Sequence, residues 1–316
     1  MNKVNKSAKA SIALFVVTVI WGWTFVWMKE ALNFSLGTAE NPSEYVGEGS
    51  TMTVVSLFIA LRFGIAAILM PLVIPNIRRE LKSKEVWKGG GILAGLVLGG
   101  FLFQMHALKE IDPAVSAFLT SLYVIFTAII YSILNKKIIR KSLAFGVILA
   151  TFGAGYIQGP PQVEFGQAEW FTVICALIFG FHIIATDRIT KIMSPMAVTM
   201  TSICMAAIGG IIIFLYSYST EKVATDLRFV YESEFLVPLL LCSVLGTLMA
   251  LSLVNYFQKY LNPVRAAVLF ALEPVWATLI SIIYGMTGIT LWLFVGGGAL
   301  LVGNLISELN TEKNSE

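Results

Sequence analysis

The sequence predicts an all-α integral membrane protein in which ten transmembrane helices form two inverted five-helix repeats. Composition indicates the class, because the 316-residue chain is 57% hydrophobic and only 13% charged, whereas soluble domains are about 25% charged. Apolar runs of roughly 20 residues, the length that crosses the hydrocarbon core as a helix, recur along the whole chain. The repeat is indicated by one apolar stretch that returns half a chain later.

Ten apolar segments are candidate spans. Their approximate bounds are 11–32, 53–74, 88–107, 113–134, 142–158, 170–187, 196–217, 235–257, 263–284 and 289–307. Three lysines precede the first segment but no small-residue cleavage site follows it, so we interpret it as a retained helix and not as a signal peptide. Most connections are short, and we therefore expect helices that are neighbours in sequence to pack against one another.

The basic residues predict the orientation. Sixteen of the 22 lysines and arginines fall in one set of loops and four in the alternate set. Loops rich in lysine and arginine stay in the cytoplasm, so we expect a multi-pass protein of the cell membrane with both termini in the cytoplasm. Two cytoplasmic termini require an even number of spans, which ten satisfies. The net charge of +3 does not indicate a nucleic-acid partner, because the sequence has no basic face and no nucleic-acid-binding motif.

The repeat comes from two stretches that align without gaps. Residues 104–131 and 254–281 are offset by 150, and both contain a Lys-x-x-x-Pro pattern ahead of a helix of the same length. They belong to the fourth and ninth spans, which are five helices apart and so cross the membrane in opposite directions. Similar sequences in opposite orientation form an inverted repeat, as in many transporters with a midplane site. The two halves are 1–157 and 158–316.

A second similarity links the first and sixth spans. Residues 20–23 (IWGW) resemble residues 178–181 (IFGF) at an offset of 158. The change of offset from 158 to 150 requires loops of different length in the two halves.

Glu273 is the most unusual residue of the ninth span, because it lies near the middle of the membrane and is followed by Pro274. A carboxylate there costs roughly 2.5–3.5 kcal/mol on insertion scales, which makes it a candidate for binding substrate or coupling protons. The alternative is that Glu273 only bonds a neighbouring helix. Pro274 has no N–H to donate, so we expect the helix to kink there.

Other polar side chains are candidates for a cavity wall. The fourth span carries hydroxyls spaced 4, 3, 4 and 4 residues apart, which form one stripe of a helix and either line a cavity or bond neighbouring helices: Ser116, Thr120, Tyr123, Thr127 and Tyr131. Gln104 and His106 end the third span, and His182 lies in the sixth. A single histidine in a membrane is more often an interhelical hydrogen-bond donor than a catalyst. Arg62 is interpreted as structural, either paired with a carboxylate or reaching toward the interface.

Several chemistries are excluded by missing patterns. The three cysteines, at 175, 204 and 242, are far apart and have no metal-ligand spacing, so we expect neither a metal nor a disulfide. No phosphate-binding G-x-x-x-x-G-K-[ST] loop occurs. Transport driven by ATP hydrolysis in this chain, or a bound cofactor, is therefore not expected.

Short motifs occur in a characteristic order along nearly the whole chain. They are Trp21-Gly22, Leu61-Arg62-Phe63, Gln104, Ala117-Phe118-Leu119-Thr120, Leu122-Tyr123-Val124, Pro263-Val264-Arg265-Ala266-Ala267 and Leu272-Glu273-Pro274-Val275. In this order the chain resembles the drug/metabolite transporter superfamily and, within it, the EamA-like family of ten-helix carriers. The resemblance implies two inverted five-helix repeats around a central cavity, with Gln104, Tyr123, Glu273 and Trp276 near it. It also implies transport of small metabolites, often export of amino acids or related compounds.

The sequence therefore predicts a secondary transporter working by alternating access and not an enzyme. Its partners are a small-molecule substrate, the lipid bilayer and, through Glu273, protons as coupling ion; no oligomeric state follows. The expected substrate-binding residues are Gln104, His106, Tyr123, His182, Glu273 and Trp276. An uptake carrier or drug efflux protein of the same fold is the alternative. A membrane-embedded enzyme using His106, His182 or Asp187, or a channel, represents other classes.

Overall fold

The computed structural model describes residues 3–38, 40–47, 50–136, 141–156, 160, 166–220 and 226–312. Within these ranges the regular structure is helical, apart from an isolated bridge between Gly37 and Pro42. The helices of the first half are α1 (Lys3–Leu36), α2 (Thr51–Val73), α3 (Lys84–Leu108), α4 (Pro113–Thr120), α5 (Tyr123–Asn135) and α6 (Lys141–Tyr156). Those of the second are α7 (Gln167–Ile192), α8 (Pro195–Thr220), α9 (Ser233–Leu241), α10 (Ala250–Phe257), α11 (Pro263–Phe270), α12 (Glu273–Ile283) and α13 (Leu291–Glu312).

Shorter helical segments connect or interrupt these helices. A π-helical segment, Cys242–Met249, lies between α9 and α10, and 3₁₀ turns occupy Pro75–Lys82, Leu227–Tyr231 and Gln258–Tyr260. The eighth predicted span is thus one continuous path with a wide turn in its middle.

Eight segments of the described chain are long and apolar enough to cross a bilayer, which makes this a multi-pass membrane protein. They are Lys6–Leu36, Thr51–Val73, Lys84–Leu108, Pro113–Asn135, Gln167–Ile192, Pro195–Thr220, Ser233–Tyr260 and Pro263–Ile283. These segments match the first four predicted spans and the sixth to ninth. The fifth and tenth predicted spans are the helices α6 and α13, which are not among the eight.

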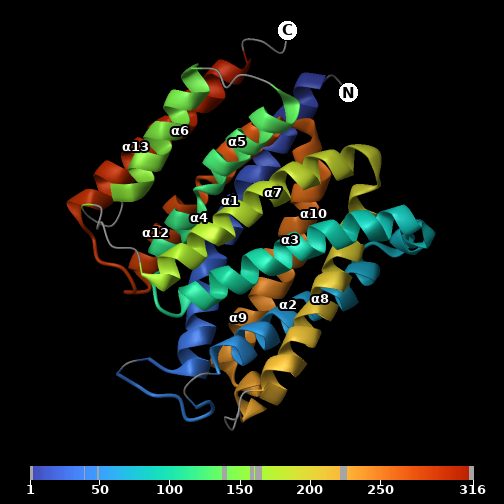
Figure 1. Ribbon diagram of the computed structural model, residues 1–316, viewed down its shortest axis with the longest axis vertical. Helices are drawn as coiled ribbons and strands as arrows, with labels where there is room; N and C mark the ends of the chain where they lie inside the picture. Colours follow the sequence, from blue (N-terminus) through green and yellow to red (C-terminus); the bar gives the residue numbers. More distant parts are fainter. Residues whose placement is uncertain are drawn as a thin grey trace.

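The closest helix packing joins the two halves of the chain. In Figure 1, α6 lies along α13 at one edge of the bundle and α2 crosses α8 at the opposite edge. Between these edges α3 packs on α7 and α8, and α1 packs on α9, α10 and α12. Helices that are neighbours in sequence also contact one another, as expected, but the most extensive contacts are with helices of the other half.

Glycines allow the two halves to approach closely. A Cβ atom on Gly210 of α8 would lie 3.0 Å from the Cα atom of Ala60 in α2. Small residues at a crossing let helix backbones come together, which is how membrane helices gain packing energy without a hydrophobic driving force between them.

Two membrane helices are broken at matching positions. The helix from Pro113 is interrupted between α4 and α5, and the helix from Pro263 between α11 and α12. Tight turns occur at both breaks, where Leu122 N–H donates to the Leu119 carbonyl (3.2 Å) and Leu272 N–H to the Leu269 carbonyl (3.1 Å). The kink predicted at Pro274 is confirmed. The fourth predicted span is found as one membrane segment, but it has a break at residues 121–122 that no proline marks.

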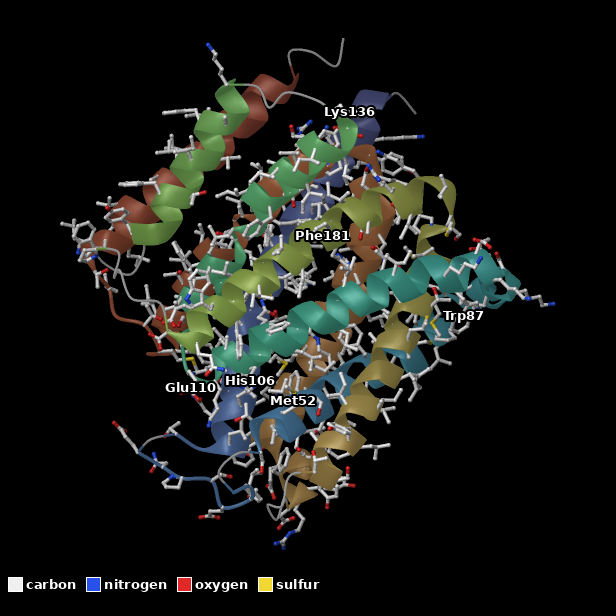
Figure 2. The ribbon with its side chains drawn as sticks, viewed as in Figure 1. Met52, Trp87, His106, Glu110, Lys136 and Phe181 are labelled. Atoms are coloured by element: carbon white, nitrogen blue, oxygen red, sulfur yellow. The ribbon has the colours of Figure 1, made fainter. Side chains whose placement is uncertain are left out.

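The two ends of the bundle are distinct. Helix α1 begins and α13 ends at the same end of the bundle (Figure 1), where Figure 2 also has Lys136. At the other end, where Figure 2 shows His106 and Glu110, Lys29 Nζ donates to the carbonyls of Leu108 (2.9 Å) and Lys109 (2.7 Å). This ammonium satisfies carbonyls that the end of α3 leaves without helical partners.

Candidate functional site

A small cavity lies in the middle of the bundle, where helices of both halves meet. Its wall comprises Trp21, Thr24, Phe25, Val97, Phe101, Gln104, Thr120, Tyr123, Phe179, His182, Ile183, Leu251, Phe270 and Glu273. The centre of a water-sized sphere can move through about 50 Å³ of this cavity. The wall is mostly aromatic and apolar, with a few polar groups, as in sites that bind small molecules.

The polar centre of this cavity is a hydrogen bond between the two broken helices. Tyr123 Oη donates to Glu273 Oε2 at 3.3 Å, and the two residues are 150 positions apart. Both lie at the first residue of the second helical piece, directly after the break, and both side chains are buried. The tight turns therefore fix the place where the tyrosine and the carboxylate meet.

Two further polar residues of the wall were predicted from the sequence. Gln104 Nε2 donates to Thr120 Oγ1 at 3.4 Å, which links α3 to α4, and His182 of α7 is buried. Four of the six predicted binding residues, namely Gln104, Tyr123, His182 and Glu273, thus line one cavity. No ion pair among the described residues involves the Glu273 carboxylate.

His106 and Trp276 are not part of this wall. The His106 ring packs against Phe171 with ring centroids 5.4 Å apart, and its Nδ1 has no hydrogen-bond partner among the described residues. Trp276 Nε1 donates to Thr18 Oγ1 at 3.2 Å, so its indole joins α12 to α1.

The hydroxyl stripe of the fourth span is divided by the helix break. Thr120 and Tyr123 line the cavity, whereas Ser116 and Thr127 are buried elsewhere and their hydroxyls have no partner among the described residues. The fifth hydroxyl, on Tyr131, accepts from Asn262 Nδ2 at 3.2 Å near the start of α11. The stripe therefore contributes to the cavity over one turn.

The similarity between residues 20–23 and 178–181 has a spatial counterpart. A Cβ atom on Gly22 would lie 2.6 Å from Trp276 Cβ, and a Cβ atom on Gly180 would lie 2.9 Å from Phe126 Cβ. Positions 126 and 276 are themselves 150 apart. The residue before each glycine, Trp21 or Phe179, lines the cavity.

Arg62 behaves differently from its prediction. It has no exposed surface, and among the described residues it forms no ion pair. The interpretation that it pairs with a carboxylate or reaches the interface is therefore wrong. Its guanidinium is held instead by Thr247 Oγ1, 2.6 Å from Nε, and by the face of the Phe101 ring, 4.2 Å from Cζ.

Several wall residues were not identified from the sequence. Thr24, Phe25, Phe101 and Leu251 are ordinary residues in apolar helices, and no single-sequence pattern separates them from residues that face lipid. Phe179 could have been identified from the sequence, since it occupies the same place in residues 178–181 as Trp21 does in residues 20–23. Among the described residues no three potential metal ligands lie together.

Comparison with known proteins identifies the family. The sequence model of the EamA-like transporter family matches this chain twice, over residues 48–157 and 167–308. The chain belongs to the EamA-like transporter family. One match covers α2 to α6 and the other α7 to most of α13, so each half of this EamA transporter carries its own match.

Similar proteins carry compatible names. An uncharacterized transporter of Archaeoglobus fulgidus is 28% identical over 277 residues, which cover 88% of this chain and 78% of the relative. The uncharacterized transporter YoaV of Bacillus subtilis is 24% identical over 174 residues, 54% of this chain and 53% of the relative. A crystal structure with 15% sequence identity superposes with a TM-score of 0.71 over 98% of this chain and 99% of its own. That last likeness concerns the fold alone.

Proposed function

We propose that this EamA transporter is a secondary carrier that exports amino acids or related small metabolites by alternating access. Its ten helices span the cell membrane with both termini in the cytoplasm, and residues 1–157 and 158–316 are two inverted five-helix repeats. The observation that carries this proposal is the cavity around the Tyr123–Glu273 hydrogen bond, which takes its wall from both halves of the chain.

The contacts between matching positions support the inverted repeat. When a two-fold axis relates two halves, a residue beside the axis meets its own counterpart. Tyr123 meets Glu273 at a separation of 150 residues, which is the offset of the two aligned stretches. The close approach of Gly22 to Trp276 is repeated by that of Gly180 to Phe126, as a two-fold axis between the halves requires.

The contact across the cavity supports alternating access. Because Tyr123 of one half is hydrogen-bonded to Glu273 of the other, we interpret this conformation as one in which the two halves are closed on each other at the centre. Rocking of one half against the other would enlarge the cavity toward one side at a time. The breaks between α4 and α5 and between α11 and α12 are the natural hinges, since both adjoin the cavity.

Coupling to protons is the finer part of the proposal and rests on Glu273. Its buried carboxylate has an uncharged hydrogen-bond donor, Tyr123, and no ion pair among the described residues. A group in this setting exchanges a proton at lower cost than a salt-bridged one, because no partner charge is left unpaired. Glu273→Gln keeps the shape and removes the proton site, so we expect its transport to become insensitive to an imposed pH gradient. A response equal to that of the wild type would contradict proton coupling.

The deciding experiment is counterflow in proteoliposomes of the purified protein, over a panel of amino acids and other small metabolites. We expect substrate inside the vesicles to accelerate entry of labelled substrate, as a carrier requires. Entry without this acceleration would indicate a channel. No entry of any panel member, beyond that into protein-free vesicles, would contradict the proposal.

Direction and chemistry need their own measurements. Vesicles of one orientation, loaded on either side, distinguish export from uptake, and drug-like compounds in the panel test efflux of drugs. Recovery of the transported compound with its mass unchanged separates a carrier from an enzyme. In the His106→Ala/His182→Ala variant an enzyme would lose its reaction, whereas a carrier still returns the transported compound unchanged, even where loss of His182 from the cavity wall slows transport.

A further inference from the structure

Arg62 is the largest side chain in the described structure that is completely buried. Guanidinium groups stay protonated inside proteins, and a buried charge without a countercharge is strongly destabilising. Nε donates to Thr247 Oγ1 at 2.6 Å and Nη1 contacts Met28 Sδ at 3.4 Å, while Nη2 has no hydrogen-bond partner among the described residues. The positive charge and one donor are therefore left without a partner among the described residues.

The free donor lies directly behind the cavity wall. A Cβ atom on Gly246 would be 3.1 Å from Arg62 Nη2 and 2.5 Å from Thr24 Cγ2, so these two atoms meet at the same glycine. Thr24 and Phe101 both line the cavity, and the Phe101 ring covers the guanidinium at 4.2 Å. The guanidinium therefore lies beside two residues of the cavity wall, Thr24 and Phe101.

The π-helical segment joins Arg62 to the cavity a second time. Thr247 lies within this segment and donates to the Cys242 carbonyl at 3.0 Å, in the wide turn of a π-helix. The neighbouring Gly246 carbonyl accepts a hydrogen bond from Trp21 Nε1 at 3.2 Å, and Trp21 lines the cavity. Wide turns of this kind inside α-helices are frequent at functional sites.

We propose that Arg62 binds the carboxylate of the transported compound once the Phe101 ring moves off the guanidinium. This inference rests on the proposed transport function and narrows its substrate class to compounds with a carboxylate and a small apolar body. A planar guanidinium binds a carboxylate through two parallel hydrogen bonds, a geometry that lysine does not offer. Glu273 faces the same cavity and is suited to an amino group of the same compound.

The test compares acids with their amides, which differ in the carboxylate alone. The pairs are alanine, leucine and phenylalanine with alaninamide, leucinamide and phenylalaninamide, and binding is measured by the rise in unfolding temperature of the purified protein. We expect the wild type to bind at least one acid about tenfold more tightly than its amide, the effect of a charge-assisted hydrogen bond. Arg62→Gln should bring this ratio close to one, and Arg62→Lys should leave it in between.

Controls separate binding from folding. Met28→Leu removes a contact of Arg62 and keeps the charge, so the preference for the acid should persist. If Arg62→Gln does not fold, the proposal is still tested by the other two variants. Arg62→Lys should reduce the preference for the acid over its amide, and Met28→Leu should not. Equal binding of acid and amide by the wild type in every pair, or an undiminished preference in the Arg62 variants, overturns the proposal.

Counterflow with the same six compounds keeps the two proposals apart. If an acid binds through Arg62 but no compound exchanges, the carboxylate site stands and the transport proposal fails. If acids and amides exchange equally well, transport stands and the role of Arg62 is overturned.

Discussion

The broken helix α4–α5 and the broken helix α11–α12 have the same backbone and different chemistry. Each begins at a proline, breaks after its first eight residues, and resumes two residues later. At the point where they resume, the first presents Tyr123 and the second presents Glu273 to the same cavity. The comparison teaches that the two broken helices share a backbone path, whereas the carboxylate belongs to one of them.

A second difference concerns the cause of the break. The α11–α12 break has Pro274 at the second residue of the new helix, where the first break has Val124. Proline is tolerated at a helix start because its missing N–H has no helical partner there. The helix that carries Val124 breaks in the same way, so a proline is not required for the break. Pro274 is compatible with the break and is not its cause.

The largest effect is expected when both broken helices carry a carboxylate at the residue that follows the break. Tyr123→Glu would place a second carboxylate against Glu273, whose Oε2 is now 3.3 Å from the tyrosine oxygen. Two buried carboxyl groups cannot both ionise, and we expect a loss of about 3 kcal/mol in unfolding free energy, measured by thermal unfolding in detergent. The double swap Tyr123→Glu/Glu273→Tyr should recover most of this loss. If the double swap is as unstable as the single variant, the two positions are not equivalent.

The next effect compares the glycines of the repeated segments. Gly22→Ala brings a methyl group 2.6 Å from Trp276 Cβ and 2.9 Å from the Ala277 nitrogen, both of which are rigidly placed. We expect a cost of about 2 kcal/mol from overpacking. For Gly180→Ala the cost should be nearer 1 kcal/mol, because the matching distances to Phe126 Cβ and the Thr127 nitrogen are 2.9 and 3.3 Å.

Gly64→Ala is the matched control for both glycines. It lies in the interior of α2, and nothing lies within 4 Å of the added methyl group. We expect its unfolding free energy to stay within about 0.5 kcal/mol of the wild type. Equal destabilisation of all three variants would mean that the two glycine contacts are not special.

A smaller effect is expected from moving the proline to the other half. Val124→Pro should cost about 1 kcal/mol, the value of the hydrogen bond from its N–H to the Ser121 carbonyl, now 3.0 Å long. The control Ala128→Pro lies inside the continuous part of α5, where proline costs about 3 kcal/mol or more. Equal costs in thermal unfolding would show that the first break is not a true helix start.

The helical fold was more predictable from the sequence than the residues of the cavity wall. Composition and charge counts predicted a multi-pass helical protein, and the 150-residue offset singled out the two helices that meet at the cavity. The break after Thr120 could not be predicted, since Ser121 and Leu122 are ordinary helix residues and no proline follows them. Pro274, in contrast, marks its break in the sequence.

The residues of the cavity wall that could be predicted from the sequence are those whose polar side chains stand out in apolar helices. Gln104, Tyr123, His182 and Glu273 are polar groups in apolar helices, and all four line the cavity. His106 and Trp276 have the same kind of signal but lie outside the wall, because polarity does not tell which face of a helix meets the centre. For Arg62 the sequence suggested a countercharge, and the structure has a hydroxyl and an aromatic ring in its place.

The smallest effect is expected from giving α12 the same aromatic residue as α5 at the matching position outside the cavity wall. Trp276→Phe gives position 276 the residue found at position 126, and it removes the hydrogen bond from Nε1 to Thr18 Oγ1. We expect a cost of at most about 1 kcal/mol and counterflow within about twofold of the wild type, because the indole joins two helices and is not part of the cavity wall. Thr18→Val removes the same bond from the other side and should match it in both measurements. Loss of counterflow in Trp276→Phe alone, at unchanged stability, would instead assign this indole to the substrate.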